Sequence, residues 1–131
     1  MNRPEQYEAD ILFFFESHPV ERELYQALFS QLDRMFPEGS VRVQKTQISF
    51  YGRHLFAAAS LPVRRKKGWP AQCLVVTIGL PCPLTSPRAV VSTEPYPGRW
   101  TNHVLLSRAE EIDGELLQWL QEAYAFAQSK R

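Results

Sequence analysis

Seven polar residues in the middle of the chain have the side chains needed to hold an anion. They are Lys45, Gln47, Ser49, Tyr51, Arg53, Arg99 and His103. Arginine can grip a carboxylate or phosphate with two parallel hydrogen bonds, while lysine, hydroxyl groups and aromatic rings add charge, donors and a stacking surface. We therefore expect these residues to bind an anionic small molecule, a nucleotide or a segment of nucleic acid.

His103 also allows a catalytic interpretation. An imidazole can act as general base when it lies within about 3 Å of a hydroxyl in a pocket, and Ser49 and Tyr51 provide hydroxyls. No serine stands in the G-x-S-x-G pattern that presents a nucleophile at a strand-to-helix turn. An enzyme with His103 as general base is therefore the less favoured alternative to a non-enzymatic binding module.

Metal and cofactor chemistry find little support in the sequence. His54 and His103 belong to no spaced ligand motif, and the two cysteines, Cys73 and Cys82, are too few for a structural zinc site or a disulfide framework. The glycines are too scattered for a loop that cradles phosphates. We expect no metal, no cofactor and two reduced thiols in the cytosol.

Charge is distributed unevenly along the chain, although the net charge is only +1. Residues 1–40 hold three basic and eight acidic residues, a net charge of −5. Residues 41–108 hold ten basic residues and a single acidic one, Glu94, a net charge of +9, and residues 109–131 have a net charge of −3. Such a cationic excess attracts anions. The alternative is that carboxylates of the flanking segments pair with these cations and neutralise them.

Two helices are predicted before the basic segment. Pro4 in a first turn, followed by a stripe from Tyr7 to Phe15, predicts a short amphipathic helix that ends near Glu16. Apolar residues then recur every three or four positions from Val20 to Met35, which predicts a second helix that begins at Pro19.

A third helix is predicted near the carboxyl end. Ser107 followed by Glu110 has the spacing of a capping box, and Asp113 is a second candidate N-cap. An apolar stripe from Leu116 to Ala127 continues this helix.

Between the helices, the alternation of apolar and polar residues predicts strands. Gln47, Ser49 and Tyr51, with Lys45 at the same parity, are expected to point away from the helices, as are Arg99, Thr101 and His103 on a later strand. The apolar run 73–80 predicts a central strand covered on both faces. The expected fold is α+β and two-layered: two N-terminal helices, an antiparallel sheet of about five to six strands, and one C-terminal helix.

The length of 131 residues predicts one domain spanning residues 1–131. The longest apolar run has five residues, far below the roughly 20 needed for a membrane span. The first ten residues contain acidic side chains where a signal peptide would be basic and then apolar. We therefore expect a cytoplasmic protein with no membrane partner.

Four stretches carry a family resemblance: residues 45–50, the Phe56-Ala57 pair, residues 97–103 and residues 112–124. In them the chain is similar, nearly end to end, to a bacterial family of domains of unknown function, family 5655. That family has no established activity or catalytic residues, so the resemblance implies no reaction. Some relatives look like proteins labelled "predicted transport protein", a label that nothing in this sequence supports.

A protein-interaction or homo-oligomerisation domain is the main alternative to ligand binding. Tyr96, Trp69, Trp100 or an edge strand would then form the contact, and a homodimer is the simplest product. The run Arg64–Lys67 is expected to be an exposed basic loop.

Overall fold

The elements follow the predicted order, helices first, then strands, then a last helix. The computed structural model describes residues 1–130. The helices are α1 (Tyr7–Phe14), α2 (Pro19–Met35), the short 3₁₀ helix η1 (Ala109–Glu111) and α3 (Gly114–Ser129). The strands are β1 (Ser40–Val43), β2 (Ile48–Tyr51), β3 (Leu55–Ser60), β4 (Leu74–Leu80), β5 (Ala89–Tyr96) and β6 (Arg99–Leu106).

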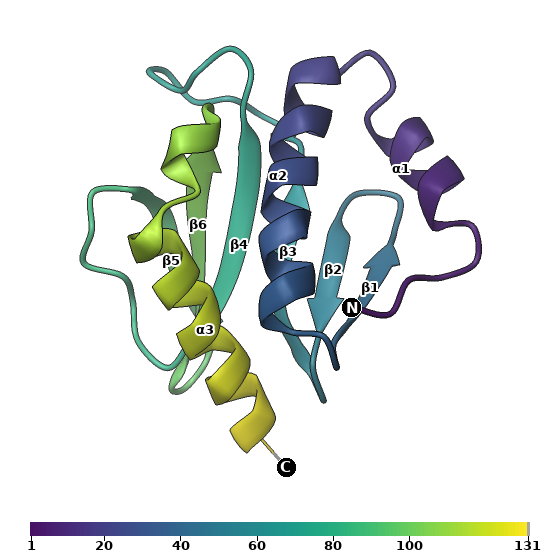
Figure 1. Cartoon of the computed structure of the whole chain (residues 1–131). Coiled ribbons are helices and arrows are strands. Elements are labelled where there is room, and N and C mark those ends of the chain that lie inside the picture. The colour runs from purple at the N-terminus through teal and green to yellow at the C-terminus, as the bar shows by residue number, and fades with distance from the viewer. Residues whose placement is uncertain (131) are drawn as a thin grey trace.

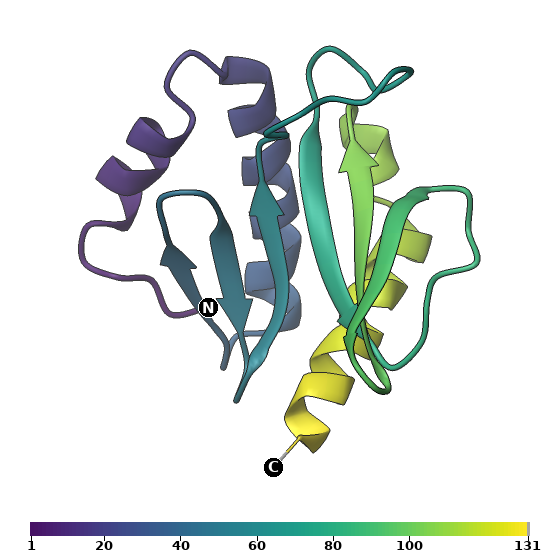
Figure 2. The same ribbon diagram turned by 180° about the vertical axis from the view of Figure 1, so that it is seen from behind.

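The six strands form one sheet in the order β1-β2-β3-β4-β6-β5, and every neighbouring pair is antiparallel. Helices α2 and α3 lie across one face of this sheet, and α1 lies beside β1 and β2 (Figure 1). Seen from behind, the other face of the sheet carries no helix (Figure 2). The α+β, two-layer prediction is confirmed, and the sheet has one covered and one open face.

The core lies between the two helices and the covered face. Leu24, Leu28 and Leu32 follow one another every four residues along α2 and are almost completely buried. They pack against Ile48, Phe50, Val76, Ile78, Val104 and Leu106 of the sheet and Leu116, Leu120, Ala123 and Ala127 of α3. Each buried leucine contributes about 1.5–3 kcal/mol relative to an exposed one, so these periodic stripes fix which faces meet. None of the helices described here combines the length and apolar character that crossing a bilayer requires.

Helix α1 is shorter than predicted. Pro4 lies before the helix, in a turn closed by the Tyr7 N–H and the Pro4 carbonyl, and the helix ends at Phe14. The Tyr7 and Tyr25 hydroxyls form a buried hydrogen bond of 2.7 Å that joins α1 to α2. Burial raises the pKa of Tyr7 to about 12, so this contact is between neutral hydroxyls.

The start of α3 differs from the predicted capping box. Glu111, rather than Glu110, reaches back to Ser107, and its Oε1 accepts the Ser107 N–H at 2.7 Å and the Arg108 N–H at 3.0 Å. The turn η1 separates Ser107 from the helix, so the register moves by one residue. Asp113 is the N-cap, as the second candidate predicted, and its Oδ1 accepts the Leu116 N–H at 3.0 Å.

The prediction that β4 is covered on both faces is wrong for half of the strand. Thr77 and Gly79 point to the open face and keep partial exposure, whereas Ile78 and Leu80 are buried under the helices. A bulge in the β2–β3 pairing places Phe56 opposite no residue of β2 and turns its ring towards Phe36, 5.1 Å away between ring centroids. The bulge keeps the Phe56 ring on the covered face.

Candidate binding site on the open sheet face

The open face is hollowed over β3 and β4, with a volume of about 410 Å³. Leu55, Phe56, Ala57, Ala58 and Gly79 are its apolar lining residues, and Gln47, Ser60, Thr77, Thr101 and His103 supply polar groups. The side chain of Ala58 is small and Gly79 has none, which lowers the surface over β3 and β4. The volume lies in the usual range of about 300–1,000 Å³ for small-molecule sites.

His103 is the only titratable group among these lining residues. It pairs with Thr77 across β6 and β4, and its Nδ1 lies 2.9 Å from the Thr77 hydroxyl. Burial lowers the pKa of His103, so the imidazole is neutral at pH 7. Within residues 1–130 its Nε2 has no hydrogen-bond partner, which leaves that nitrogen available to a ligand.

Of the predicted site residues, Gln47 and His103 line the hollow. Ser49 faces the open side, as its parity predicts, but is fully buried: its hydroxyl donates to Gln44 Oε1 at 2.6 Å and accepts from Gln47 Nε2 at 2.8 Å. Tyr51 is half-buried beneath the Arg42 guanidinium, 4.6 Å above its ring. Neither Ser49 nor Tyr51 reaches the hollow.

The catalytic alternative paired His103 with Ser49 or Tyr51, and the sheet order separates them. Ser49, Ala58, Thr77 and His103 stand in one row across the sheet. Two strands therefore lie between Ser49 and His103, which places their Cα atoms roughly 14 Å apart at about 4.8 Å per strand. The hydroxyl beside the imidazole belongs to Thr77 instead.

Lys45 and Arg99 lie outside the hollow. Lys45 is in the β1–β2 turn and lines a different hollow beside α1, together with Asp10 and Phe13. Arg99 is exposed at the start of β6, two residues before Thr101. Contact of these cations with a ligand stays a prediction.

Arg53 occupies the β2–β3 turn, which docks on the last turn of α3. Its backbone N–H donates to Gln128 Oε1 at 2.6 Å, and its guanidinium lies 3.5 Å from the Gln128 carbonyl. A Cβ on Gly52 would lie 2.3 Å from Gln128 Oε1 and 2.8 Å from the ring of Tyr124, so a larger residue would displace these side chains. Arg53 therefore leans towards the helix and away from the hollow.

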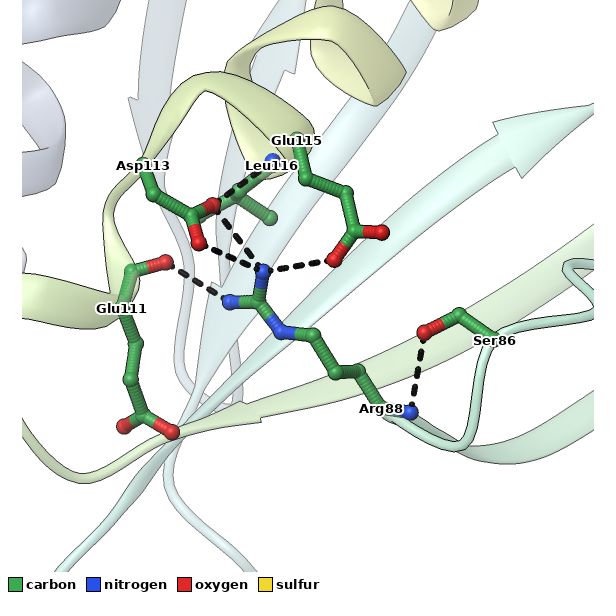
Figure 3. Close-up of polar contacts among 6 residues, drawn as sticks. All are labelled: Ser86, Arg88, Glu111, Asp113, Glu115 and Leu116. Carbon is green, nitrogen blue, oxygen red and sulfur yellow. Dashed lines mark hydrogen bonds and ion pairs between the residues drawn. The ribbon is translucent and has the colours of Figure 1, made fainter.

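Arg88 is the one cation of the basic segment that forms an ion pair with a carboxylate, among the residues described. Its Nη1 lies 2.9 Å from Asp113 and 3.0 Å from Glu115, and its Nη2 donates to the Glu111 carbonyl at 2.7 Å (Figure 3). The guanidinium also lies 5.5 Å from the Trp119 ring centroid. Helix carboxylates thus neutralise this arginine and tie β5 to the start of α3.

Asn102 is a structural residue that the sequence reasoning missed. Its side chain is fully buried, and its Oδ1 accepts the Leu84 N–H at 3.0 Å and the Ser92 hydroxyl at 2.7 Å. Its Nδ2 lies 3.4 Å from the carbonyls of Ile78 and Cys82. A signal was present, because an amide at a position with core parity must find buried partners.

The cysteines have different environments. Cys73 is buried, and burial raises the pKa of its thiol, whereas Cys82 is exposed. Within residues 1–130 no cluster of three histidine, cysteine or acidic side chains is arranged to hold a metal ion.

Comparisons with known proteins give a family and nothing finer. Neither a search of curated proteins nor a search of solved structures found a match. A family model described as "Domain of unknown function (DUF5655)" matches residues 13–127, which include all six strands and most of α3. The chain therefore belongs to this family of domains of unknown function.

Proposed function

We propose that this chain is a non-enzymatic binding module that holds a small anionic ligand of nucleotide size in the hollow on its open sheet face. The observation that carries the proposal is the lining of that hollow: amide, hydroxyl and imidazole groups surround an apolar floor, and no carboxylate is among them. Neutral donors can hold an anion by hydrogen bonds, and an apolar floor suits the flat face of a ring.

The surrounding charge favours an anion over a cation. The one acidic residue between Val41 and Arg108 is Glu94, and its carboxylate accepts the Gly98 N–H at 3.0 Å. Arg99 lies two residues before the lining residue Thr101 on the same strand, about 7 Å along the extended chain. Within a Debye length of about 8 Å at physiological salt, such a cation attracts an anion without touching it.

Titration of the full chain with inorganic phosphate, nucleoside monophosphates and a single-stranded oligonucleotide tests this proposal. We expect a monophosphate to bind, more weakly as salt rises, and His103→Ala to weaken binding by about 1–3 kcal/mol. His18→Ala, an exposed histidine at the start of α2, is the matched control and should change nothing. Tighter binding of the oligonucleotide would indicate a nucleic acid site. Failure of every probe to bind would refute the proposal.

A second candidate, self-association, is favoured by one observation at the β5 edge of the sheet. Strand β5 is an edge strand, with Tyr96 66% exposed and Val90 36% exposed. An open edge offers backbone groups to another strand. If two copies pair there, sedimentation should find a dimer that Val90→Lys dissociates. A monomer at all concentrations would exclude it.

A further inference from the structure

Another hollow lies where the connection between α1 and α2 meets the long loop between β3 and β4. It has a volume of about 160 Å³ and is lined by His18, Glu21, Leu61, Arg65, Ala71 and Gln72, among others. None of these residues belongs to the site on the open sheet face.

Glu21 lines this hollow as a buried carboxylate without a hydrogen-bond donor. Its side chain is only 7% exposed, and His18 Nδ1 lies 3.7 Å from Oε2, beyond hydrogen-bond distance. No hydrogen bond from residues 1–130 to this carboxylate is present, and its oxygens are not among the side-chain atoms that are both sealed from solvent and unpartnered. Carboxylates in buried side chains normally have donors, because burial without them is costly. Water or a ligand in the hollow is therefore the source of donors for Glu21.

Arg65 supplies the opposite charge in the same hollow. Its Nη1 donates to the Ala71 carbonyl, which anchors the guanidinium there and leaves its other N–H groups free for a carboxylate. Arg64, Lys66 and Lys67 are exposed on the same loop. The hollow thus combines one buried anion with an anchored cation and a cationic surround.

This combination selects a ligand that carries both charges. A simple cation would meet the repulsion of the basic loop, and a simple anion would meet the Glu21 carboxylate. We propose that the hollow binds a free α-amino acid, with its ammonium group on Glu21 and its carboxylate on Arg65. Leu61 and Ala71 provide apolar contacts for a small side chain, such as that of alanine or valine. The proposal is independent of the site on the open sheet face.

Calorimetric and NMR titrations of the full chain with alanine and valine test the proposal, with methylammonium and acetate as single-charge probes. We expect the amino acids to bind and both single-charge probes to bind at least about tenfold more weakly. Glu21→Gln and Arg65→Gln should each weaken amino acid binding at least about tenfold. Glu23→Gln and Arg34→Gln, which carry the same charges on exposed residues outside the hollow, are the matched controls and should bind as the parent does.

Three results would overturn the assignment: no binding of either amino acid, equal binding of methylammonium or acetate, or unchanged binding by Glu21→Gln. Thermal unfolding of each variant shows whether it is folded. If Glu21→Gln does not fold, Glu21→Asp and Arg65→Gln carry the test, and unchanged amino acid binding by both would equally overturn it.

Discussion

Replacing Asn102 by alanine should destabilise the fold through the groups it leaves behind. The change removes the acceptor of the half-buried Leu84 N–H, and leaving such a donor unsatisfied costs about 1–3 kcal/mol. The Ser92 hydroxyl loses a bond worth about 1 kcal/mol, while the two 3.4 Å contacts of Nδ2 add little. We therefore expect Asn102→Ala to lower the free energy of unfolding by about 2–4 kcal/mol.

Urea unfolding followed by circular dichroism measures this loss, and two further variants apportion it. Ser92→Ala should lower the free energy of unfolding by only about 1 kcal/mol. Asn102→Asp keeps the acceptor but sets a carboxylate against two carbonyl oxygens, so its stability relative to the parent should improve as pH falls and the acid becomes protonated. A loss below about 0.5 kcal/mol for Asn102→Ala would refute the assignment of the amide as the anchor of the β4–β5 connection.

Three other perturbations test the parts of the fold that hold the sheet to α3. Arg88→Ala should lower the free energy of unfolding by about 1–3 kcal/mol, whereas Arg64→Ala, an exposed control, should change it by less than about 0.5 kcal/mol. Equal effects in thermal unfolding would contradict a stabilising role of the Arg88 ion pairs. Burial raises the pKa of Glu111, but hydrogen bonds from Ser107 and Arg108 outweigh it, so the folded pKa lies below the ordinary 4.5. The ionised Glu111 carboxylate contributes its full stabilisation above pH 4.5 and loses it as pH falls through the folded pKa. Glu111→Gln should therefore lose less free energy of unfolding between neutral and acid pH than the parent does. An identical dependence of stability on pH in the two proteins would exclude this role. Gly52→Ala should lower the free energy of unfolding by about 1–3 kcal/mol, because the added methyl group overpacks the contact with α3. Gly114→Ala, whose methyl group would meet nothing within 4 Å, should leave the protein equally stable or more stable. The reverse order in urea unfolding would contradict the close approach of the β2–β3 turn to α3.

The fold could largely be predicted because its signals are local and periodic. The four-residue spacing of Leu24, Leu28 and Leu32 determines a helix whatever surrounds it, and period two correctly placed Gln47 and His103 on the open face. The bulge at Phe56 could not be predicted, because it depends on a ring fitting between α2 and α3 rather than on any pattern along β3.

The candidate site could be predicted less well than the fold, because two of its three predicted cations, Lys45 and Arg53, lie in turns. Alternation fixes the direction of a side chain only within a strand, so it could not show that Arg53 leans towards α3 or that Lys45 faces α1. Parity also says nothing of neighbours, which is why Ser49 was placed on the correct face without its cover of two glutamines. The hollow itself depends on the order of the strands, which brings Thr77 beside His103.

The most direct test of the central proposal is an NMR titration of the full chain with a nucleoside monophosphate at low salt. We predict that amide shifts concentrate on the residues of the hollow, with Gln47, Thr77, Thr101 and His103 foremost, and that the pKa of His103 rises as the anion binds. Shifts confined to the basic loop 64–67, or an unchanged His103, would contradict it.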